Sequence, residues 1–343
     1  MDRIKYSIII AVYNRLEEVK DLLKSFEELQ FDTKRFEVLF IDDGSTDGFK
    51  EFIKNYITQM KIRVFYQENR GPGIARNNGM KNAFGEYFIF IDSDCFVPPS
   101  WLLEIDIALK KNYLDAFGGP DTAHQSFSTL LKAINYSMTS FLGTGGTRGS
   151  SKSLSKFYPR SFNMGIKESV FKKIGGMSEL RHGQDMDYSQ RIYDAGFKVG
   201  LVKNAFVYHK RRTSIPKFFR QVFNWGIARI NLSISHPSIL KPIHLLPIAV
   251  VLWISILGVF SLFNIYLVSI LSFITIVCYS LINIFAFFQS FLINKSLFVA
   301  VFSVLILNIQ VFAYGLGLIT ALWQTKILRR SQAVGFTKGY YGK

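Results

Sequence analysis

The feature that most limits how this chain can fold is a long stretch with almost no charge near its C-terminal end. From Leu245 to Thr325, a stretch of 81 residues, the only charged side chain is Lys295. A soluble domain needs charged side chains to keep its surface solvated, so this stretch predicts a membrane region. It divides into three apolar segments, and each exceeds the roughly 20 helical residues that a bilayer crossing takes. These segments are residues 242–263, 265–288 and 296–324.

The basic residues gather next to this apolar stretch. The net charge is +16, and nine basic residues but no acidic ones lie between Ala195 and His244. Such a cluster follows the positive-inside rule and suits anionic lipid headgroups, so we expect membrane contact and no nucleic-acid partner. Cys95 and Cys278 alone make no disulfide framework, which agrees with a reducing compartment. The sequence therefore predicts a multi-pass protein of the cell membrane with its N-terminal domain in the cytoplasm.

The number of true membrane spans stays open at this level. The tail, residues 326–343, contains basic residues and no acid, and this favours the cytoplasmic side. Three spans would place that tail on the opposite side from the N-terminal domain. Either one apolar segment is re-entrant or interfacial, or the tail is translocated despite its charge. We therefore expect two to three spans within residues 242–325.

The first 100 residues alternate strand and helix patterns. Residues 6–12, 38–41, 62–66 and 87–91 are apolar runs of the kind found in buried parallel strands, and helical patterns separate them. This βαβαβαβ order predicts an α/β fold with a mostly parallel sheet flanked by helices. A second αβ portion is expected over residues 163–209, after a polar segment, residues 143–152, interpreted as a mobile loop.

Residues 214–241 form the boundary between the two regions. Phe219, Val222, Phe223 and Ile230 can share one face of a helix, opposite basic residues. We interpret this segment as an amphipathic helix on the membrane surface, although an ordinary surface helix would show the same pattern. The expected organisation is an N-terminal α/β domain (1–213), an interfacial helix (214–241), a membrane region (242–325) and a basic tail (326–343).

Polar residues follow the predicted strands where parallel sheets bind ligands. Asp92 and Asp94 come directly after the strand at residues 87–91, and two carboxylates there can hold a hard divalent cation beside phosphate oxygens. The tripeptide alone is a weak signal, because solvated loops often contain it. Its position at the mouth of a buried strand, where desolvation is costly, favours the functional interpretation.

Six short motifs occur in a fixed order along the chain. They are SIIIAVYN (7–14), IDDGSTD (41–47), ARNNG (75–79), FIDSD (90–94), GQDMDYSQR (183–191) and VYH (207–209). Together they resemble glycosyltransferase family 2, over about residues 5–230. The resemblance implies a GT-A fold and an inverting enzyme that uses a UDP- or GDP-type nucleotide-diphospho-sugar with Mg²⁺ or Mn²⁺.

The resemblance also implies roles for individual residues. Donor-nucleotide contacts would come from Tyr13, Asp42, Asp43, Arg76 and Asp92. Asp94 would bind the metal, and His209 matches a position that approaches it, although a structural histidine is as good an interpretation. Arg211 and Arg212 would neutralise the leaving diphosphate, or else serve as juxtamembrane anchors.

The segment at residues 183–191 matches the family's acidic pair, with Gln184 in place of the first acid. Asp185 remains, and one carboxylate is enough to take the proton from an acceptor hydroxyl. Gln184 can only form hydrogen bonds, to the acceptor in our interpretation. Asp187 is a candidate orienting carboxylate, with a helix-start residue as the rival interpretation.

Trp225 lies in a motif that resembles the Q-x-x-R-W element of processive polysaccharide synthases, where the Trp stacks on an acceptor sugar. Asn224 replaces the Arg, which makes processive synthesis doubtful, and Trp225 serves equally well as an interfacial anchor.

The expected function is transfer of a sugar from the nucleotide donor to a hydroxyl of a lipid-linked saccharide, in cell-surface glycan or polysaccharide biosynthesis. Two alternatives stay open, a polyprenyl-phosphate sugar synthase and a non-catalytic nucleotide-sugar-binding scaffold. A phosphate acceptor needs no general base, so Asp185 argues against the first. The presence of Asp92, Asp94 and Asp185 argues against the second.

Overall fold

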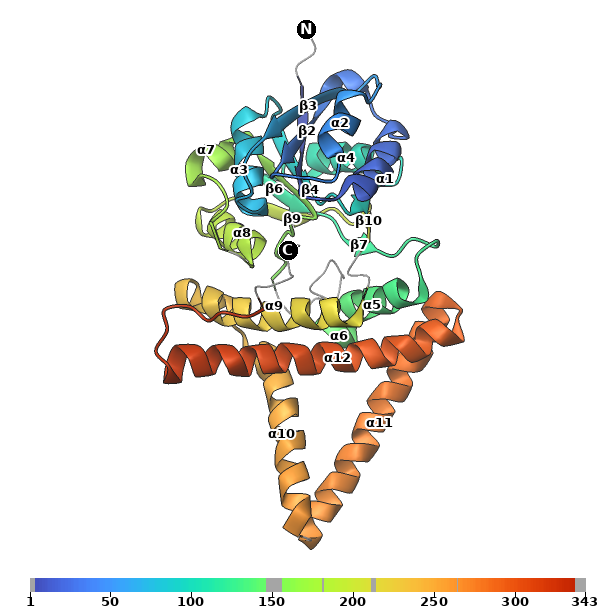
Figure 1. Cartoon of the computed structure of the whole chain (residues 1–343), viewed down its shortest axis with the longest axis vertical. Coiled ribbons are helices and arrows are strands. Elements are labelled where there is room, and N and C mark those ends of the chain that lie inside the picture. Colours follow the sequence, from blue (N-terminus) through green and yellow to red (C-terminus); the bar gives the residue numbers. More distant parts are fainter. Residues whose placement is uncertain (1–3, 146–155, 181, 211–213, 264, 337–343) are drawn as a thin grey trace. The chain divides into compact units, whose positions relative to one another are not determined.

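The computed structural model describes residues 4–145, 156–180, 182–210, 214–263 and 265–336. The chain forms two compact units (Figure 1). Unit 1 comprises Met1–Gln125 and Gly146–Lys210, and unit 2 comprises Ser126–Gly145 and Arg211–Lys343. Arg211, Arg212 and most of the expected loop at 143–152 lie outside the described residues.

Unit 1 is built on a mostly parallel sheet. Among the described residues, seven strands pair in the order β3-β2-β1-β4-β8-β6-β9. Only β8 runs against its neighbours β4 and β6. A small second sheet has the order β5-β10-β7. The strands are β1 (Tyr6–Val12), β2 (Phe36–Asp42), β3 (Lys61–Tyr66), β4 (Tyr87–Ile91), β5 (Cys95–Phe96), β6 (Ala116–Gly118), β7 (Asp121–Thr122), β8 (Asn163–Lys167), β9 (Val199–Leu201) and β10 (Val207–His209).

Helices cover both faces of the large sheet because alternate strand residues point to opposite sides. Ile8 and Ile10 of β1 belong to one apolar cluster, together with residues of α1, α2 and α4. Ile9 belongs to the other cluster, together with residues of α3, α7 and α8. These helices are α1 (Leu16–Glu27), α2 (Phe49–Lys54), α3 (Pro72–Asn82), α4 (Trp101–Asn112), α7 (Glu168–Ile174) and α8 (Gln184–Asp194). The βαβαβαβ order expected from the sequence is confirmed.

Unit 2 is helical. Its helices are α5 (Thr129–Thr139), α6 (Phe141–Thr144), α9 (Ile215–Ser235), α10 (Leu246–Phe260), α11 (Tyr266–Asn294) and α12 (Leu297–Leu322). Within this unit α12 packs along α9 and α5, whereas α10 and α11 converge in a V (Figure 1). Among the residues that the structure describes, three helical segments are long and apolar enough to cross a membrane: Pro242–Phe263, Tyr266–Asn294 and Leu297–Ile327.

The boundary between the units differs from the expected domain division in one segment. Ser126–Gly145 falls within the expected first domain but belongs to unit 2. The reason is packing, because Ala133, Ile134 and Met138 of α5 share an apolar cluster with Phe218 and Val222 of α9. The expected helix at 214–241 appears as α9, and part of its apolar side is covered by α12 within the protein.

Candidate active site

The loops that follow β1 and β2 are joined by hydrogen bonds. Asn14, with a left-handed φ of 50°, donates its backbone N–H to Ser45 Oγ at 3.0 Å. Its side-chain oxygen accepts from the Thr46 N–H at 2.7 Å. Tyr13, which comes directly after β1, is half-buried beside these contacts. The carboxyl edge of the sheet therefore has a defined shape at its first two strands.

Asp42 and Asp43 are both buried and both organise backbone. Asp42 Oδ1 accepts from the Ser45 N–H at 2.9 Å. Asp43 accepts from the Gln67 side-chain amide at 2.7 Å and from the N–H groups of Arg70 and Gly71 at 2.9 and 2.8 Å. Because three donors converge on one carboxylate, Asp43 fixes the loop that enters α3.

Arg76 and Asp92 form an ion pair at this edge. Arg76 Nη2 lies 2.6 Å from Asp92 Oδ1, and the arginine side chain is 8% exposed. Its Nε is buried and has no hydrogen-bond partner among the described residues. Buried polar groups are nearly always paired in folded proteins, so this guanidinium has a donor group available for a ligand.

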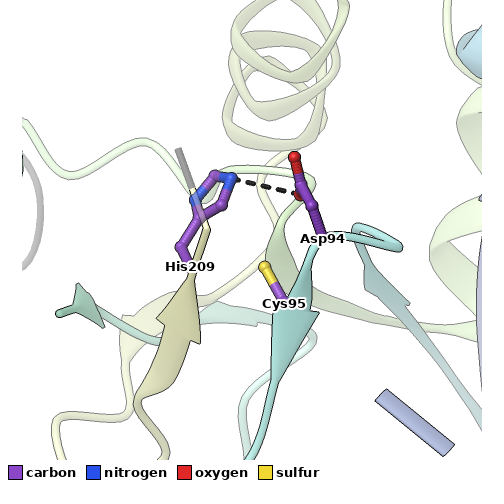
Figure 2. A group of neighbouring side chains, drawn as sticks. All are labelled: Asp94, Cys95 and His209. Carbon is purple, nitrogen blue, oxygen red and sulfur yellow. Dashed lines mark ion pairs between the residues drawn. The ribbon is translucent and has the colours of Figure 1, made fainter. Parts of the chain in front are cut away.

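Asp94, His209 and Asp121 are brought together by the small sheet. His209 pairs with Cys95 across β10 and β5, and Val207 pairs with Asp121 across β10 and β7. As a result, His209 Nε2 lies 3.3 Å from Asp94 Oδ1 (Figure 2). The other ring nitrogen, Nδ1, lies 3.3 Å from Asp121 Oδ2. The imidazole therefore has a carboxylate at each of its nitrogens.

Asp94, Cys95 and His209 also form a group that could hold a metal ion, with potential ligand atoms within 4.8 Å of one another. A carboxylate oxygen and an imidazole nitrogen are common ligands of first-row divalent metals. Cys95 is 1% exposed and packs in the larger apolar cluster of unit 1, as buried thiols commonly do.

Arg15 contributes positive charge near the same carboxylates. It precedes α1, and its Nη1 donates to Glu18 Oε1 at 2.7 Å. Burial lowers the pKa of the Arg15 guanidinium, but the carboxylates of Asp94, Glu18 and Asp92 raise it more, so it ends above its usual value. A fixed cation at this edge suits a ligand with phosphate groups.

The first turn of α8 contains three further candidates, Gln184, Asp185 and Asp187. Gln184 packs over Gly73 of α3, where a Cβ would lie only 2.5 Å from the glutamine amide nitrogen. Asp185 Oδ2 lies 3.8 Å from Arg160 Nη1, and Asp185 Oδ1 accepts from the Met186 N–H at 2.9 Å. The start of α8 is thus held next to the start of α3.

Asp187 has a clear structural partner. Its Oδ2 lies 3.0 Å from Arg191 Nε, and the arginine also donates to the carbonyls of Ile174 and Gly176. This network ties α8 to the end of α7, which fits the interpretation of Asp187 as a structural residue at a helix start. Trp225 belongs to unit 2, where it packs against the cluster of α5, α9 and α12.

Three residues of the site were not found from the sequence. Arg15 and Arg160 lie beside Asp94 and Asp185 respectively, but no motif marks an isolated arginine. Asp121 lies 88 positions from His209 along the chain, on a strand of two residues. The only available signal was its position after the Gly-Gly-Pro run at 118–120.

Much of unit 1 is similar in sequence to known proteins. Residues 7–175 match the model of the family described as glycosyl transferase family 2. An uncharacterized glycosyltransferase of Rickettsia felis is 45% identical over 91 residues, which are 26% of this chain and 15% of that protein. Glycosyltransferase AglE of Haloferax volcanii is 25% identical over 237 residues, 66% of this chain and 76% of that protein.

A solved structure extends the similarity of fold. The mannosyltransferase PcManGT from Pyrobaculum calidifontis, solved with GDP-Man and Mn²⁺, has a TM-score of 0.65 at 14% identity. The match covers 94% of this chain and 88% of that one, so the likeness includes the helical unit. By contrast, the matched region makes up only 15% of the two Rickettsia relatives.

Proposed function

This chain belongs to glycosyltransferase family 2, and from that premise we propose that it is a membrane-anchored inverting glycosyltransferase. It takes a sugar from a nucleotide-diphospho-sugar and adds it to a hydroxyl of a lipid-linked saccharide. The observation that carries this proposal is the Asp94–His209 pair at the carboxyl edge of the sheet, next to the Arg76–Asp92 pair in the same D-x-D turn.

The donor side rests on the basic residues of this edge. Arg76, whose buried Nε has no partner in the described part of the chain, and Arg15, which is electrostatically coupled to Asp94 and Asp92, offer donors to diphosphate oxygens. Tyr13, Asp42 and Asp43 line or shape the loops that would receive the nucleoside. The neighbour of the same fold from Pyrobaculum calidifontis is solved with GDP-Man, which supports a nucleotide-sugar donor.

The Asp94 carboxylate and the His209 imidazole fit a divalent cation. Asp94 and His209 would hold it, and the nitrogen ligand favours Mn²⁺ over the harder Mg²⁺, which prefers oxygen ligands alone. Such an ion supplies positive charge for the oxygens of the departing nucleoside diphosphate. Mn²⁺ in the Pyrobaculum structure supports this assignment.

The acceptor side rests on Asp185. Its carboxylate takes the proton from the acceptor hydroxyl as the oxygen attacks the sugar carbon, while the bond to the donor phosphate breaks. Asp185 lies in the first turn of α8, close to the positive end of the helix dipole. Gln184 cannot take a proton, so its amide serves only to hydrogen-bond a neighbouring group.

The membrane part rests on unit 2. We assign α10 and α11 to a hairpin in the bilayer, because only 11% and 6% of their most apolar windows are buried in the protein. For α12 that share is 39%, since one side packs on α9 and α5. Because α12 is apolar and is partly covered by other helices of the protein, it suits a position at the membrane surface, where a lipid-linked acceptor would lie.

The test separates donor use from transfer. In purified full-length protein, Asp94→Asn should abolish Mn²⁺-dependent release of nucleotide, since it removes a cation ligand. Asp185→Asn should still bind the donor but should lower transfer to a lipid-linked acceptor by at least about 100-fold, the usual contribution of a general base. Asp194→Asn, at the other end of α8, is the matched control and should transfer at the parental rate.

Two outcomes would contradict the assignment. Parental transfer by the Asp185→Asn protein would remove the general base and favour a phosphate acceptor, which needs none. Donor binding without release or transfer in the parental protein, across UDP- and GDP-sugars, would favour a scaffold.

A further inference from the structure

Asp121 is a completely buried carboxylate that none of the motifs includes. Its side chain is 0% exposed, whereas the His209 side chain is 14% exposed and that of Asp94 23%. Burying a carboxylate is costly unless a hydrogen-bond donor or a positive charge faces it. Nδ1 of His209 lies 3.3 Å from its Oδ2.

The backbone around Asp121 leaves it little freedom. The Val207 N–H donates to the Pro120 carbonyl at 3.1 Å, which ties β10 to the residue before Asp121. Asn163 Nδ2 donates to the Ala205 carbonyl at 2.7 Å on the same side. A Cβ on Gly119 would overlap with both of these groups, so the chain approaches as closely as glycine permits.

The imidazole ring is held as firmly. Phe162 packs against it with ring centroids 5.2 Å apart, and the backbone N–H of Lys210 donates to the Asp94 carbonyl at 2.8 Å. The second contact continues the β10–β5 pairing past His209, so Asp94 and His209 lie side by side at the strand ends (Figure 2). Both partners of the ring are therefore fixed before any ligand binds.

We propose that Asp121 is a positioning residue that accepts a hydrogen bond from His209 Nδ1–H and so holds the tautomer whose Nε2 lone pair faces Asp94. This inference rests on the proposed function, because it takes Asp94 and His209 as the cation ligands. A carboxylate behind a ligating histidine fixes the ring orientation and increases the basicity of the ligand nitrogen. In this proposal Asp121 acts through His209 and does not contact the sugar donor or the acceptor substrate itself.

The first experiment measures metal binding rather than activity. Free Mn²⁺ is followed by electron paramagnetic resonance during titration of the purified full-length protein. Asp121→Ala should weaken Mn²⁺ binding roughly 10- to 100-fold, the usual effect of removing such a partner. Asp121→Asn keeps the shape of the side chain, so its Mn²⁺ affinity should lie between those of the parental protein and Asp121→Ala. The control is Asp115→Asn, at an acidic residue outside this cluster, which should bind Mn²⁺ like the parental protein.

Kinetics supply a second readout. In Asp121→Ala the Mn²⁺ concentration for half-maximal nucleotide release should rise by the same factor, whereas kcat at saturating Mn²⁺ should stay near the parental value. A fall in kcat with an unchanged Mn²⁺ requirement would overturn the positioning role.

The tautomer itself can be read without any variant at Asp121. The chain has five histidines, so ¹⁵N-histidine spectra with diamagnetic Zn²⁺, which accepts imidazole ligands, at mildly alkaline pH can be assigned with His209→Gln. The parental protein should show a proton on Nδ1 of His209. A proton on Nε2 would overturn the proposal even if every Asp121 variant failed to fold.

Failure of this inference differs from failure of the proposed function. If His209→Ala leaves Mn²⁺ binding unchanged, the metal site itself is wrong. If His209→Ala weakens binding but Asp121→Ala does not, the site stands and the role of Asp121 falls. If both roles are right, the double variant should bind Mn²⁺ no more weakly than His209→Ala alone, because Asp121 acts through the histidine.

Discussion

Gly119 has no side chain, yet it determines where the carboxylate of Asp121 can lie. It is packed against the Ala205 carbonyl and the Asn163 side chain, and these two groups are themselves joined by a hydrogen bond. The same asparagine accepts from the Trp101 indole at 3.2 Å. The proposed metal site therefore depends on packing several residues away from Asp94 and His209.

Gly119→Ala is expected to damage the site without removing any ligand. The new Cβ has to displace backbone on one side, at a cost on the order of 1–3 kcal/mol in unfolding free energy. Thermal unfolding in detergent measures this loss, and Mn²⁺ binding should weaken with it. The control is Gly196→Ala, where the new Cβ meets open space but the backbone has a positive φ. This variant should lose stability through that φ alone and should keep Mn²⁺ binding. Unchanged unfolding and Mn²⁺ binding in Gly119→Ala would refute the packing argument.

The sequence was enough to predict the residues proposed to contact the metal and the donor, but not the residue proposed to position one of them. Asp92 and Asp94 could be found because they follow a strongly apolar strand, and His209 because it lies in one of the motifs that resemble the family. Asp121 could not, because its carboxylate is important only through a ring that a three-stranded sheet places beside it. The pairing joins the two-residue strand β7 to the three-residue strand β10, which are far apart in the chain, so no local sequence pattern could predict it.

At the scale of elements, α9 combines two kinds of contact. Gly226 of α9 and Gly317 of α12 each lie against the backbone of the other helix, so the two axes approach closely. On α9, Asn224 exchanges two hydrogen bonds with the Phe336 backbone, and Asn231 exchanges two with that of Ala333. Spaced seven residues apart, the two asparagines hold the C-terminal segment along one side of the helix.

Asn224→Ala should release this segment. Asn224 is 0% exposed, and its loss leaves backbone groups of Phe336 unpaired, at a cost on the order of 1–3 kcal/mol. Tryptic cleavage after Arg329 or Arg330 should become faster, as read by mass spectrometry. The control is Asn204→Ala, which loses one exposed hydrogen bond to Glu104 and should be cut like the parental protein. Equal cleavage rates in all three would contradict the role given to Asn224.

Asn224 also explains why the sequence was ambiguous here. It occupies the Arg position of a synthase-like motif, and from the sequence this looked only like a departure from that motif. Its partners lie 112 residues further along the chain, so no local pattern could show them. The amphipathic pattern of α9 had the same limit, since a helix packed on α12 and a helix packed on lipid show the same spacing.

At the scale of the whole molecule, we propose a topology that removes the conflict between three apolar segments and a basic tail. If α10 and α11 cross the bilayer as a hairpin and α12 lies along α9, the tail returns to the side of the catalytic unit. The basic residues Lys326, Arg329 and Arg330 then lie where the positive-inside rule favours them.

Labelling tests this topology. In sealed vesicles of known orientation, an impermeant maleimide should reach Ser331→Cys and Lys24→Cys from the same side. Each variant is made in a chain whose Cys278 is replaced by Ser, because Cys95 is buried and Cys278 is exposed. Labelling from opposite sides would mean that α12 crosses the membrane.

The most direct measurement of the central claim is nucleotide release by the purified full-length protein with a panel of UDP- and GDP-sugars, with and without Mn²⁺. We expect release from one donor, which stops with chelator, returns with Mn²⁺ and is absent from Asp94→Asn. Release that continues at the same rate in chelator, or in Asp94→Asn with Mn²⁺, would contradict the assignment of Asp94 and His209 as a cation site for donor cleavage.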